Sequence, residues 1–380
     1  MSATDTRVSL GTVLLEWGRI GCIGFGGPPT HIALLRDLCV ARHGWLTARD
    51  FEDAVAACNL LPGPASTQLA IYCAWRVRGR PGAAVGGLAF IVPGLAVILG
   101  LSMLFLAGSP PGWVRGVGAG AGAAVAAVAV HAGTTLVEPS FRSTASRARW
   151  VVYVAAGAVS AATLGPWLVL VLIACGVVEL AAQRRLGGAP LVAPLAAMLA
   201  GGGNLLSVAW VALKVGALSY GGGFVIVPLI QADAVDRYHW MTDGQFLNAV
   251  ALGQVTPGPV VHTVAVVGYA AAGLGGGLLA AAVAFSPSFA FVLLGGDRFD
   301  RLRRDHRARA FLQGAGPAAI GAILGSAIPL VAALVETWQF VVLAAAAVAI
   351  LALRVGVVVA LLGAGAVGAA IALAGGPLPG

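Results

Sequence analysis

Long apolar segments, separated by short basic or glycine- and proline-rich stretches, make up most of this 380-residue chain. Residues 151–164, 168–182 and 340–353 are segments of this kind. With their flanks they approach the ~20 apolar residues that a helix needs to cross a bilayer. Residues 30–43 and 225–238 instead place apolar and polar side chains on different helical faces, which is typical of helices that lie at a membrane interface. The pattern predicts an all-α polytopic membrane protein.

A Pro-Gly-Pro sequence occurs twice, at 62–64 and at 257–259, which is 257 − 62 = 195 residues later. Between residues 21–64 and 216–259, 15 of 44 positions are identical without a gap, including a tryptophan, a phenylalanine and a diglycine in each copy. Biased composition explains the repeated Ala and Gly, but it does not explain aromatic residues in register. The chain is therefore predicted to be a duplication.

Each Pro-Gly-Pro lies within apolar sequence and predicts the tip of a broken helix. Proline removes a backbone donor and clashes with the preceding turn, so two prolines around a glycine end one helix and start another. Arms of about 14 residues on either side, at ~1.5 Å rise per residue, cover ~20 Å. Such arms enter the bilayer and return without crossing it. We therefore predict one re-entrant broken-helix pair and about five spans per repeat, or about ten transmembrane helices in all.

The repeats are expected to occupy residues 1–182 and 205–380, joined by a linker at 183–204 that is rich in proline and glycine. The arginine cluster at 298–309 aligns with residues 103–114, which carry no charge, and the basic stretch after the first tip has no basic counterpart after the second. If basic loops face the cytoplasm, equivalent loops lie on opposite sides of the membrane. The two repeats are then inverted, as an odd number of spans per repeat requires.

Composition and charge narrow the function. Hydrophobic residues make up 59% of the chain and charged residues 10%, with a mean hydropathy of +0.92, whereas a soluble domain carries ~25% charged residues. The net charge of +8 comes from arginines clustered between apolar segments, so we expect no nucleic-acid partner. The five cysteines lack metal-ligand spacing, and no phosphate loop or catalytic constellation is present. We therefore expect no enzyme activity, no metal and no cofactor.

Inverted repeats with interrupted helices place a binding site near the middle of the bilayer, where half-helix N-termini present free N–H groups to an anion. Two sets of residues are candidates for this site. The tips contribute Pro62, Gly63, Pro64, Pro257, Gly258 and Pro259. The glycine turns contribute Gly26, Gly27, Gly221 and Gly222, which either allow close approach of a ligand or only allow close helix packing.

Two cations occupy equivalent positions shortly before the glycine turns, Arg19 and Lys214. A charge inside a span costs at least ~2.5 kcal/mol and usually faces a cavity or a partner, so the pair suggests a cage for an oxyanion. The alternative for Arg19 is an ion pair with Glu16, three residues away on the same face. The position that matches Glu16 near Lys214 is Val211, which supplies no carboxylate. Glu16 is also a candidate for proton coupling.

Polar residues flank both tips. Asn59 aligns with Gln254 before the tip, and Thr67 aligns with His262 after it. These side chains could donate to a bound anion, or they could only satisfy backbone groups that the broken helix frees. His131 is isolated in a glycine- and alanine-rich span and is expected to be structural, and the arginines at 298–309 are expected to set topology.

Several of these motifs together resemble the chromate ion transporter (CHR) family in its long, two-domain form. They are the Phe25-Gly26-Gly27-Pro28 turn, Trp45 with Phe51, Leu61-Pro62-Gly63-Pro64 with Gln68, Ser219-Tyr220-Gly221-Gly222-Gly223 and Thr256-Pro257-Gly258-Pro259. The resemblance implies a multi-pass protein of the bacterial inner membrane that exports chromate and confers chromate resistance, with sulfate as an isosteric competitor. The family's motif positions carry over onto the two glycine turns and the two Pro-Gly-Pro tips.

The expected function is thus efflux of a tetrahedral oxyanion, chromate by resemblance, by alternating access between inverted repeats. Export of a dianion from a cell that is negative inside gains ~4.6 kcal/mol per 100 mV, at ~2.3 kcal/mol per charge. Uptake or exchange of sulfate or another oxyanion, with or without proton coupling, is the alternative, and a non-transporting membrane scaffold or sensor is a remote one. The expected partners are the oxyanion and the lipid bilayer. The sequence leaves open whether the chain forms a homo-oligomer.

Overall fold

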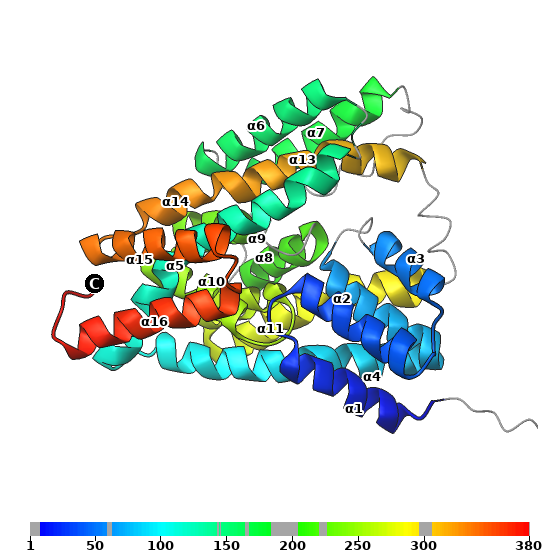
Figure 1. The fold of residues 1–380 in the computed structure, drawn as a ribbon, viewed down its shortest axis with the longest axis horizontal. Coiled ribbons are helices and arrows are strands. Elements are labelled where there is room, and N and C mark those ends of the chain that lie inside the picture. The colour runs from blue at the N-terminus through cyan, green and yellow to red at the C-terminus, as the bar shows by residue number, and fades with distance from the viewer. Residues whose placement is uncertain are drawn as a thin grey trace, which may run out of the picture.

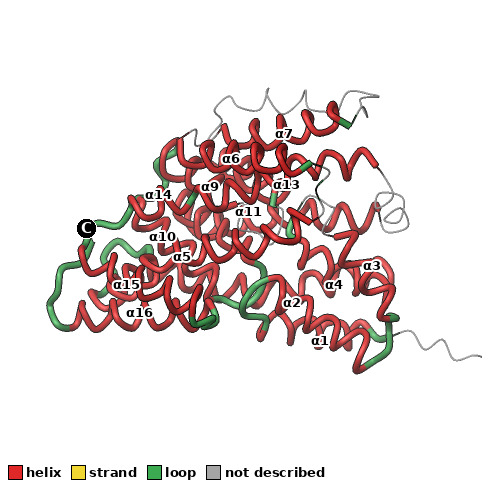
Figure 2. Tube along the Cα trace, turned by 45° about the horizontal axis from the view of Figure 1, so that its top comes forward, coloured by secondary structure: helices red, strands yellow, loops and turns green. Residues whose placement is uncertain are grey.

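The structure is a computed structural model that describes residues 8–58, 63–142, 144, 146–163, 167–183, 204–219, 226–295 and 306–379. Within these ranges the regular elements are helices and there is no strand (Figure 2). The predicted all-α class is therefore confirmed. The predicted linker falls almost wholly outside the described residues.

The elements follow the same order in both halves of the chain (Figure 1). The first half contains α1 (Leu10–Ile23), α2 (Pro28–Arg36), the π-helix η1 (Asp37–Arg42), α3 (Ala48–Cys58), α4 (Ala65–Phe105), α5 (Gly112–Arg142), α6 (Arg147–Thr163) and α7 (Leu168–Ala182). The second half contains α8 (Asn204–Leu218), α9 (Ile226–Gln231), the π-helix η4 (Ala232–Arg237), α10 (Asp243–Val255), the 3-10 turn η5 (Val260–His262), α11 (Thr263–Gly295), α13 (His306–Gly325), α14 (Ala327–Ala332), α15 (Thr337–Ala347), the π-helix η7 (Val348–Ala352) and α16 (Val357–Leu373).

Two of the long helices, α4 and α11, fold back on themselves. The turn in α4 lies at Arg78 and Gly79, where Gly79 has φ +67°, and the turn in α11 lies at Ala272 and Gly273, where Gly273 has φ +62°. Positive φ is readily adopted by glycine but strains other residues. The arm that returns from the first tip was predicted to be about 14 residues long, and residues 65–78 before this turn are 14 residues long. Each of the two helices is therefore a short arm followed by a longer apolar helix.

The packing of the later helices interlocks the two halves. Helices α6 and α7 of the first half pack on α13 of the second, and α15 and α16 of the second half pack on α5 of the first (Figure 1). Glycines allow the closest approaches: an added Cβ at Gly157 would overlap the carbonyl oxygen of Ala318, and one at Gly120 would overlap that of Ala364. Each half thus completes the helix packing of the other.

Four helical segments in the described part of the chain are long and apolar enough to cross a membrane, at residues 65–105, 112–142, 260–295 and 309–332. Shorter apolar helices occur at 168–182, 204–218, 337–352 and 357–373. These segments support a multi-pass membrane protein. The number of about ten spans and the inversion of the repeats stay predictions.

In the first amphipathic segment the apolar side chains are buried and the charges face outward, whereas residues 226–234 of the second segment are all buried, including Asp233. The predicted exposed polar face is therefore missing from this part of the second segment. In the first half Leu35 and Leu38 are buried, whereas Arg42 is exposed and pairs with Asp37. An aromatic stack follows each of the π-helices η1 and η4, at equivalent positions. His43 lies 4.2 Å from Trp45 between ring centroids in the first half, and Tyr238 lies 4.6 Å from Trp240 in the second.

Candidate functional site

Each Pro-Gly-Pro tip is held by the backbone of the opposite half. The N–H of Gly63 donates to the carbonyl of Ser219 at 3.0 Å, and the N–H of Gly258 donates to the carbonyl of Gly24 at 2.9 Å. These two bonds are equivalent under the 195-residue offset, since 24 + 195 = 219 and 63 + 195 = 258. Both tip glycines have positive φ, +118° and +94°. Each tip is therefore hydrogen-bonded to the half of the chain that does not contain it.

A buried histidine supports the crossing at Gly24. His31 lies with Nε2 2.9 Å from the Gly24 carbonyl and Nδ1 3.2 Å from Ser66 Oγ. Because a carbonyl only accepts, Nε2 must donate, which leaves Nδ1 to accept from the Ser66 hydroxyl. The Gly24 carbonyl thus accepts from both His31 and Gly258. This network joins the first glycine turn, the second tip and the start of α4.

Thr67 and His262, predicted to donate to a ligand, lie behind the tips. Both side chains are fully buried, and neither lines the cavity described in the next paragraph. The ring of His262 packs edge-on against Phe285, with centroids 5.3 Å apart, and next to Gly258. The imidazole therefore fills space behind the second tip.

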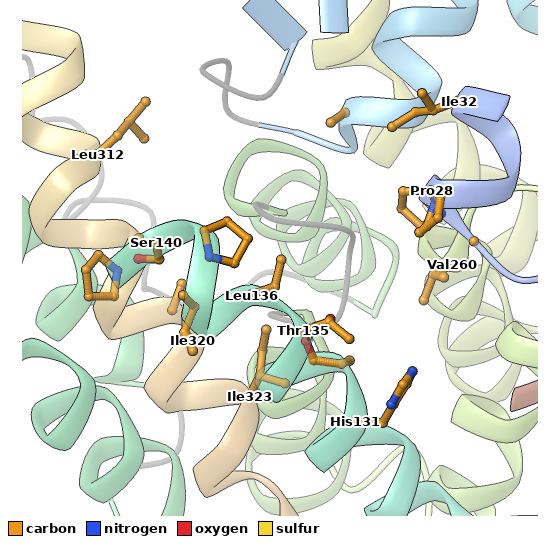
Figure 3. Close-up of a pocket in the computed structure, with 18 of the residues that line it drawn as sticks. Pro28, Ile32, His131, Thr135, Leu136, Ser140, Val260, Leu312, Ile320 and Ile323 are labelled. Atoms are coloured by element: carbon orange, nitrogen blue, oxygen red, sulfur yellow. Dashed lines mark hydrogen bonds between the residues drawn. The ribbon is translucent and has the colours of Figure 1, made fainter. Parts of the chain in front are cut away.

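A cavity of about 650 Å³ opens between the glycine turn of the first half and the helices α5 and α13 (Figure 3). In Figure 3, Pro28 and Ile32 of α2 and Val260 face α5 and α13 across this space. The predicted site residues that line the cavity are Gly26, Gly27 and Gln254. Further lining residues include Ala65, His131, Thr135, Ser140, Arg309 and Gln313.

Two helices begin at this cavity. Helix α2 starts after Gly27, which has φ +75°, and α4 starts at Ala65 after Pro64, without a side-chain cap in either case. The first N–H groups of a helix have no partner within it, and the helix dipole adds partial positive charge there. Helix α2 begins with Pro28 and Pro29, which carry no N–H, so the free donors come mainly from α4. At α4 these groups belong to Ala65 and Ser66, since the N–H groups of the next two residues bond to the Pro64 carbonyl. The cavity is thus suited to a negative ligand.

Gln254 is the polar side chain whose position best matches its predicted role. It lies in the last turn of α10 with 8% of its surface exposed, and it lines the cavity. Its Nε2 is buried and forms no hydrogen bond with the described residues. A buried amide donor without an acceptor destabilises the folded protein unless a ligand or a water molecule accepts its hydrogen bond. Its sequence counterpart Asn59 lies outside the described residues, as do Pro62, Gly221 and Gly222.

Arg309 and His131 line the cavity, although the sequence assigned them other roles. Arg309 lies in the first turn of α13, and half-buried His131 projects from α5 (Figure 3). Arg309 was interpreted as a topology determinant and His131 as a structural residue. A polar residue inside an otherwise apolar helix was the available signal for His131. Nothing in the sequence placed α13 beside the first glycine turn.

The two predicted cage cations lie apart from this cavity. Arg19 is exposed on α1, and Lys214 is 9% exposed and forms an ion pair with Asp233, which comes from η4. Val211, the position that matches Glu16, supplies no carboxylate, but Asp233 supplies one from a different element. Glu16 lies with Oε1 4.0 Å from His43 Nε2 and does not line the cavity either. The substrate role of the two cations and the coupling role of Glu16 stay predictions.

Both halves of the chain match one known protein family. A model of the family described as Chromate transporter matches residues 11–180 and 206–369. The chain belongs to the chromate transporter family. The resemblance in the glycine turns and tips is thereby confirmed. The two matched segments leave out residues 181–205, a stretch that contains the predicted linker.

Several chromate transport proteins are similar over most of their length. One from Cupriavidus metallidurans is 33% identical over 342 residues, which cover 86% of this chain and 84% of that protein. Another, from Pseudomonas aeruginosa, is 30% identical and covers 82% of this chain and 79% of its own. A probable chromate transport protein from Synechococcus elongatus is 27% identical, with 82% of each chain covered. No solved structure matches the chain. Family membership and the long apolar helices together identify a multi-pass membrane transporter.

Proposed function

We propose that this protein exports chromate across the bacterial inner membrane, and so confers resistance, by alternating access between two inverted repeats. The named function of the relatives, which share 27 to 33% of their residues with this chain, supports chromate as the substrate. The equivalent crossings of Gly63 and Gly258 support a two-fold relation between the halves. Inverted repeats provide two equivalent arrangements of one chain, open to opposite sides.

The proposed binding site is the cavity between the first glycine turn and α5 with α13. The observation that carries it is Gln254, a buried amide donor that has no acceptor among the described residues, in a cavity where α4 begins. A tetrahedral dianion presents acceptor oxygens in all directions. In the proposed complex it accepts from Gln254 and from the first N–H groups of α4, while Arg309 supplies positive charge at the cavity wall.

Membrane potential is sufficient to drive this export. Moving two negative charges out of a cell that is negative inside releases ~4.6 kcal/mol per 100 mV, since each charge gains ~2.3 kcal/mol. Sulfate is also a tetrahedral dianion and should compete for the same donors. Arg19 and Lys214 lie outside this proposed site, because Arg19 faces outward and Lys214 is paired.

The direct test is accumulation of labelled chromate in everted membrane vesicles that contain the protein, energised and de-energised, with sulfate as competitor. Accumulation that depends on potential and that sulfate reduces would support the proposal. Correctly inserted protein that accumulates no chromate under either condition would overturn it.

Gln254→Leu tests the site itself. A hydrogen bond to a charged group contributes ~1.5 to 3 kcal/mol, so the half-saturating chromate concentration should rise about 10- to 150-fold. Gln245→Leu makes the same change near the start of α10, away from the cavity, and should leave this concentration unchanged. Equal half-saturation in wild type and Gln254→Leu would remove Gln254 from the site.

A further inference from the structure

An ion pair is buried in the second half, away from the proposed binding cavity. Lys214 of α8 pairs with Oδ2 of Asp233 on η4, and its ammonium lies 5.7 Å from the centre of the Trp210 ring. The side chains of Lys214 and Asp233 are only 9% and 2% exposed. The second carboxylate oxygen, Asp233 Oδ1, is buried and forms no hydrogen bond with the described residues.

The fold does not require this pair. The equivalent positions in the first half are Arg19 and Leu38, since 19 + 195 = 214 and 38 + 195 = 233. Arg19 is exposed and Leu38 is buried in the core, yet α1, α2 and η1 form the same arrangement there. Replacing a buried ion pair by apolar residues is often neutral or stabilising. Stability therefore does not explain why the second half keeps two charges and an unsatisfied oxygen.

Nearby elements supply few other charges. The charged groups facing Asp233 are Lys214 from α8 and Arg237 from the last turn of η4. Helices α9 and α11 contain no charged residue, and the single one in α10, Asp243, is exposed at its start. Apolar surroundings favour the neutral form of a carboxylate, and the ammonium favours the ionised form. The protonation state of Asp233 thus depends on the balance between its burial, which favours the neutral acid, and its contact with Lys214, which favours the carboxylate.

We propose that Asp233 is a proton-binding site whose occupancy changes during the transport cycle. A proton from water binds the unpaired carboxylate oxygen and gives a neutral carboxylic acid, while Lys214 remains an ammonium and loses its counter-charge. The proposal rests on the transport function and adds proton coupling to it. It assigns the coupling role to Asp233 and not to Glu16, which is half-buried beside His43.

The pair is connected to a moving part of the proposed mechanism. Lys214 lies five residues before Ser219, whose carbonyl holds the first tip through the N–H of Gly63. The ion pair ties η4 to the helix that carries this carbonyl. Protonation of Asp233 releases η4 from α8 and so alters the support of the tip. π-Helical segments such as η4 occur frequently at functional sites.

The transport test uses purified full-length protein in proteoliposomes, with the membrane potential clamped to zero and an imposed pH gradient. For one coupled proton, one pH unit shifts chromate accumulation by up to about tenfold, because each unit is worth 1.36 kcal/mol. Asp233→Asn should abolish this effect of the gradient while downhill chromate flux continues. Asp236→Asn, a change on the exposed side of the same π-helix, should retain it.

A double variant separates coupling from folding. Lys214→Met with Asp233→Leu replaces both charges with apolar side chains, as Leu38 does in the first half. This variant should keep the thermal stability of the wild type and lose the response to the pH gradient. Two results would overturn the proposal. One is a wild-type protein that transports chromate but does not respond to the pH gradient, and the other is a double variant that responds as the wild type does.

A measurement without substrate keeps this test independent of the proposed function. Infrared difference spectra should show a carboxylic-acid C=O band that appears as the pH is lowered and that is missing in Asp233→Asn. Absence of an Asp233-dependent band would overturn the proton site even if chromate is transported. A band that is present in a protein that moves no chromate would leave the proton site standing and refute chromate export alone.

Discussion

Gly94 allows α4 to lie against the second tip, and Gly94→Ala should disturb that tip directly. An added Cβ would overlap the carbonyl oxygen of Pro257 and would lie 2.9 Å from Cε1 of His262. Ordinary contact at such a position begins at 3.4 Å, so the imidazole would have to retreat by 3.4 − 2.9 = 0.5 Å and the carbonyl by more. His262 is fully buried and backed by Phe285, so it has little room to move.

The cost of this overlap can be estimated. An extra methyl group in a well-packed core destabilises by about 1 to 3 kcal/mol, which corresponds to about 5- to 150-fold in the population of the native tip arrangement. Because the tip is held by one hydrogen bond between Gly258 and Gly24, we expect the tip to shift before the helix does. Chromate flux should fall by a similar factor.

The assay compares chromate accumulation in everted vesicles at matched amounts of folded protein, determined by size-exclusion chromatography in detergent. Gly100→Ala is the control on the same helix, because Gly100 is exposed and an added Cβ there meets nothing within 4 Å among the described residues. It should leave flux unchanged and raise helix stability by up to ~1 kcal/mol. Folded Gly94→Ala protein with wild-type flux would refute the role of the tip in transport.

Two further substitutions test the packing that positions the site. Glu179→Ala should lower the free energy of unfolding by about 1 to 3 kcal/mol, because it removes a buried carboxylate that accepts from Arg149 at 2.7 and 3.0 Å. Arg149 itself is 37% exposed, so water can solvate it after the change. Glu138→Ala, at a side chain 70% exposed, should lower the free energy of unfolding by under ~1 kcal/mol in the same thermal-unfolding measurement. Trp17→Phe loses the 2.8 Å hydrogen bond from Nε1 to the Ala70 carbonyl and part of a buried ring, so it should lower the free energy of unfolding by about 1 to 3 kcal/mol. An unchanged melting temperature would show that α1 does not depend on this bond.

Local chemistry made much of the fold predictable. The arm after the first tip was predicted to be about 14 residues long, and residues 65–78, which precede the turn at Gly79, are 14 residues long. The first amphipathic segment and the all-helical class also follow from residue type and spacing, whereas residues 226–234 of the second segment are buried on every face. These features depend on a few neighbouring residues, which the sequence displays directly.

The site was harder to predict because long-range packing assembles it. Arg309 reaches the cavity only because α13 packs between α5 and α6, a contact between opposite halves. Asp233 reaches Lys214 from a different helix, 19 residues along the chain. Comparing equivalent positions of the two repeats could not reveal either contact, since Arg309 and Asp233 align with the apolar residues Val114 and Leu38 of the first half.

The interlocked packing of α6 and α7 on α13 has a consequence for biosynthesis. When the first half has left the ribosome, the glycine face around Gly157 still lacks the helix that covers it, because Ala318 has not yet been made. N-terminal parts of a chain generally fold first during synthesis, but here α6 and α7 cannot complete their packing until α13 has been made. Helices α15 and α16, which are made last, in turn pack on α5 of the first half. If the chain is expressed as two fragments divided within residues 184–203, we therefore expect it to fold only when both fragments are inserted into the same membrane.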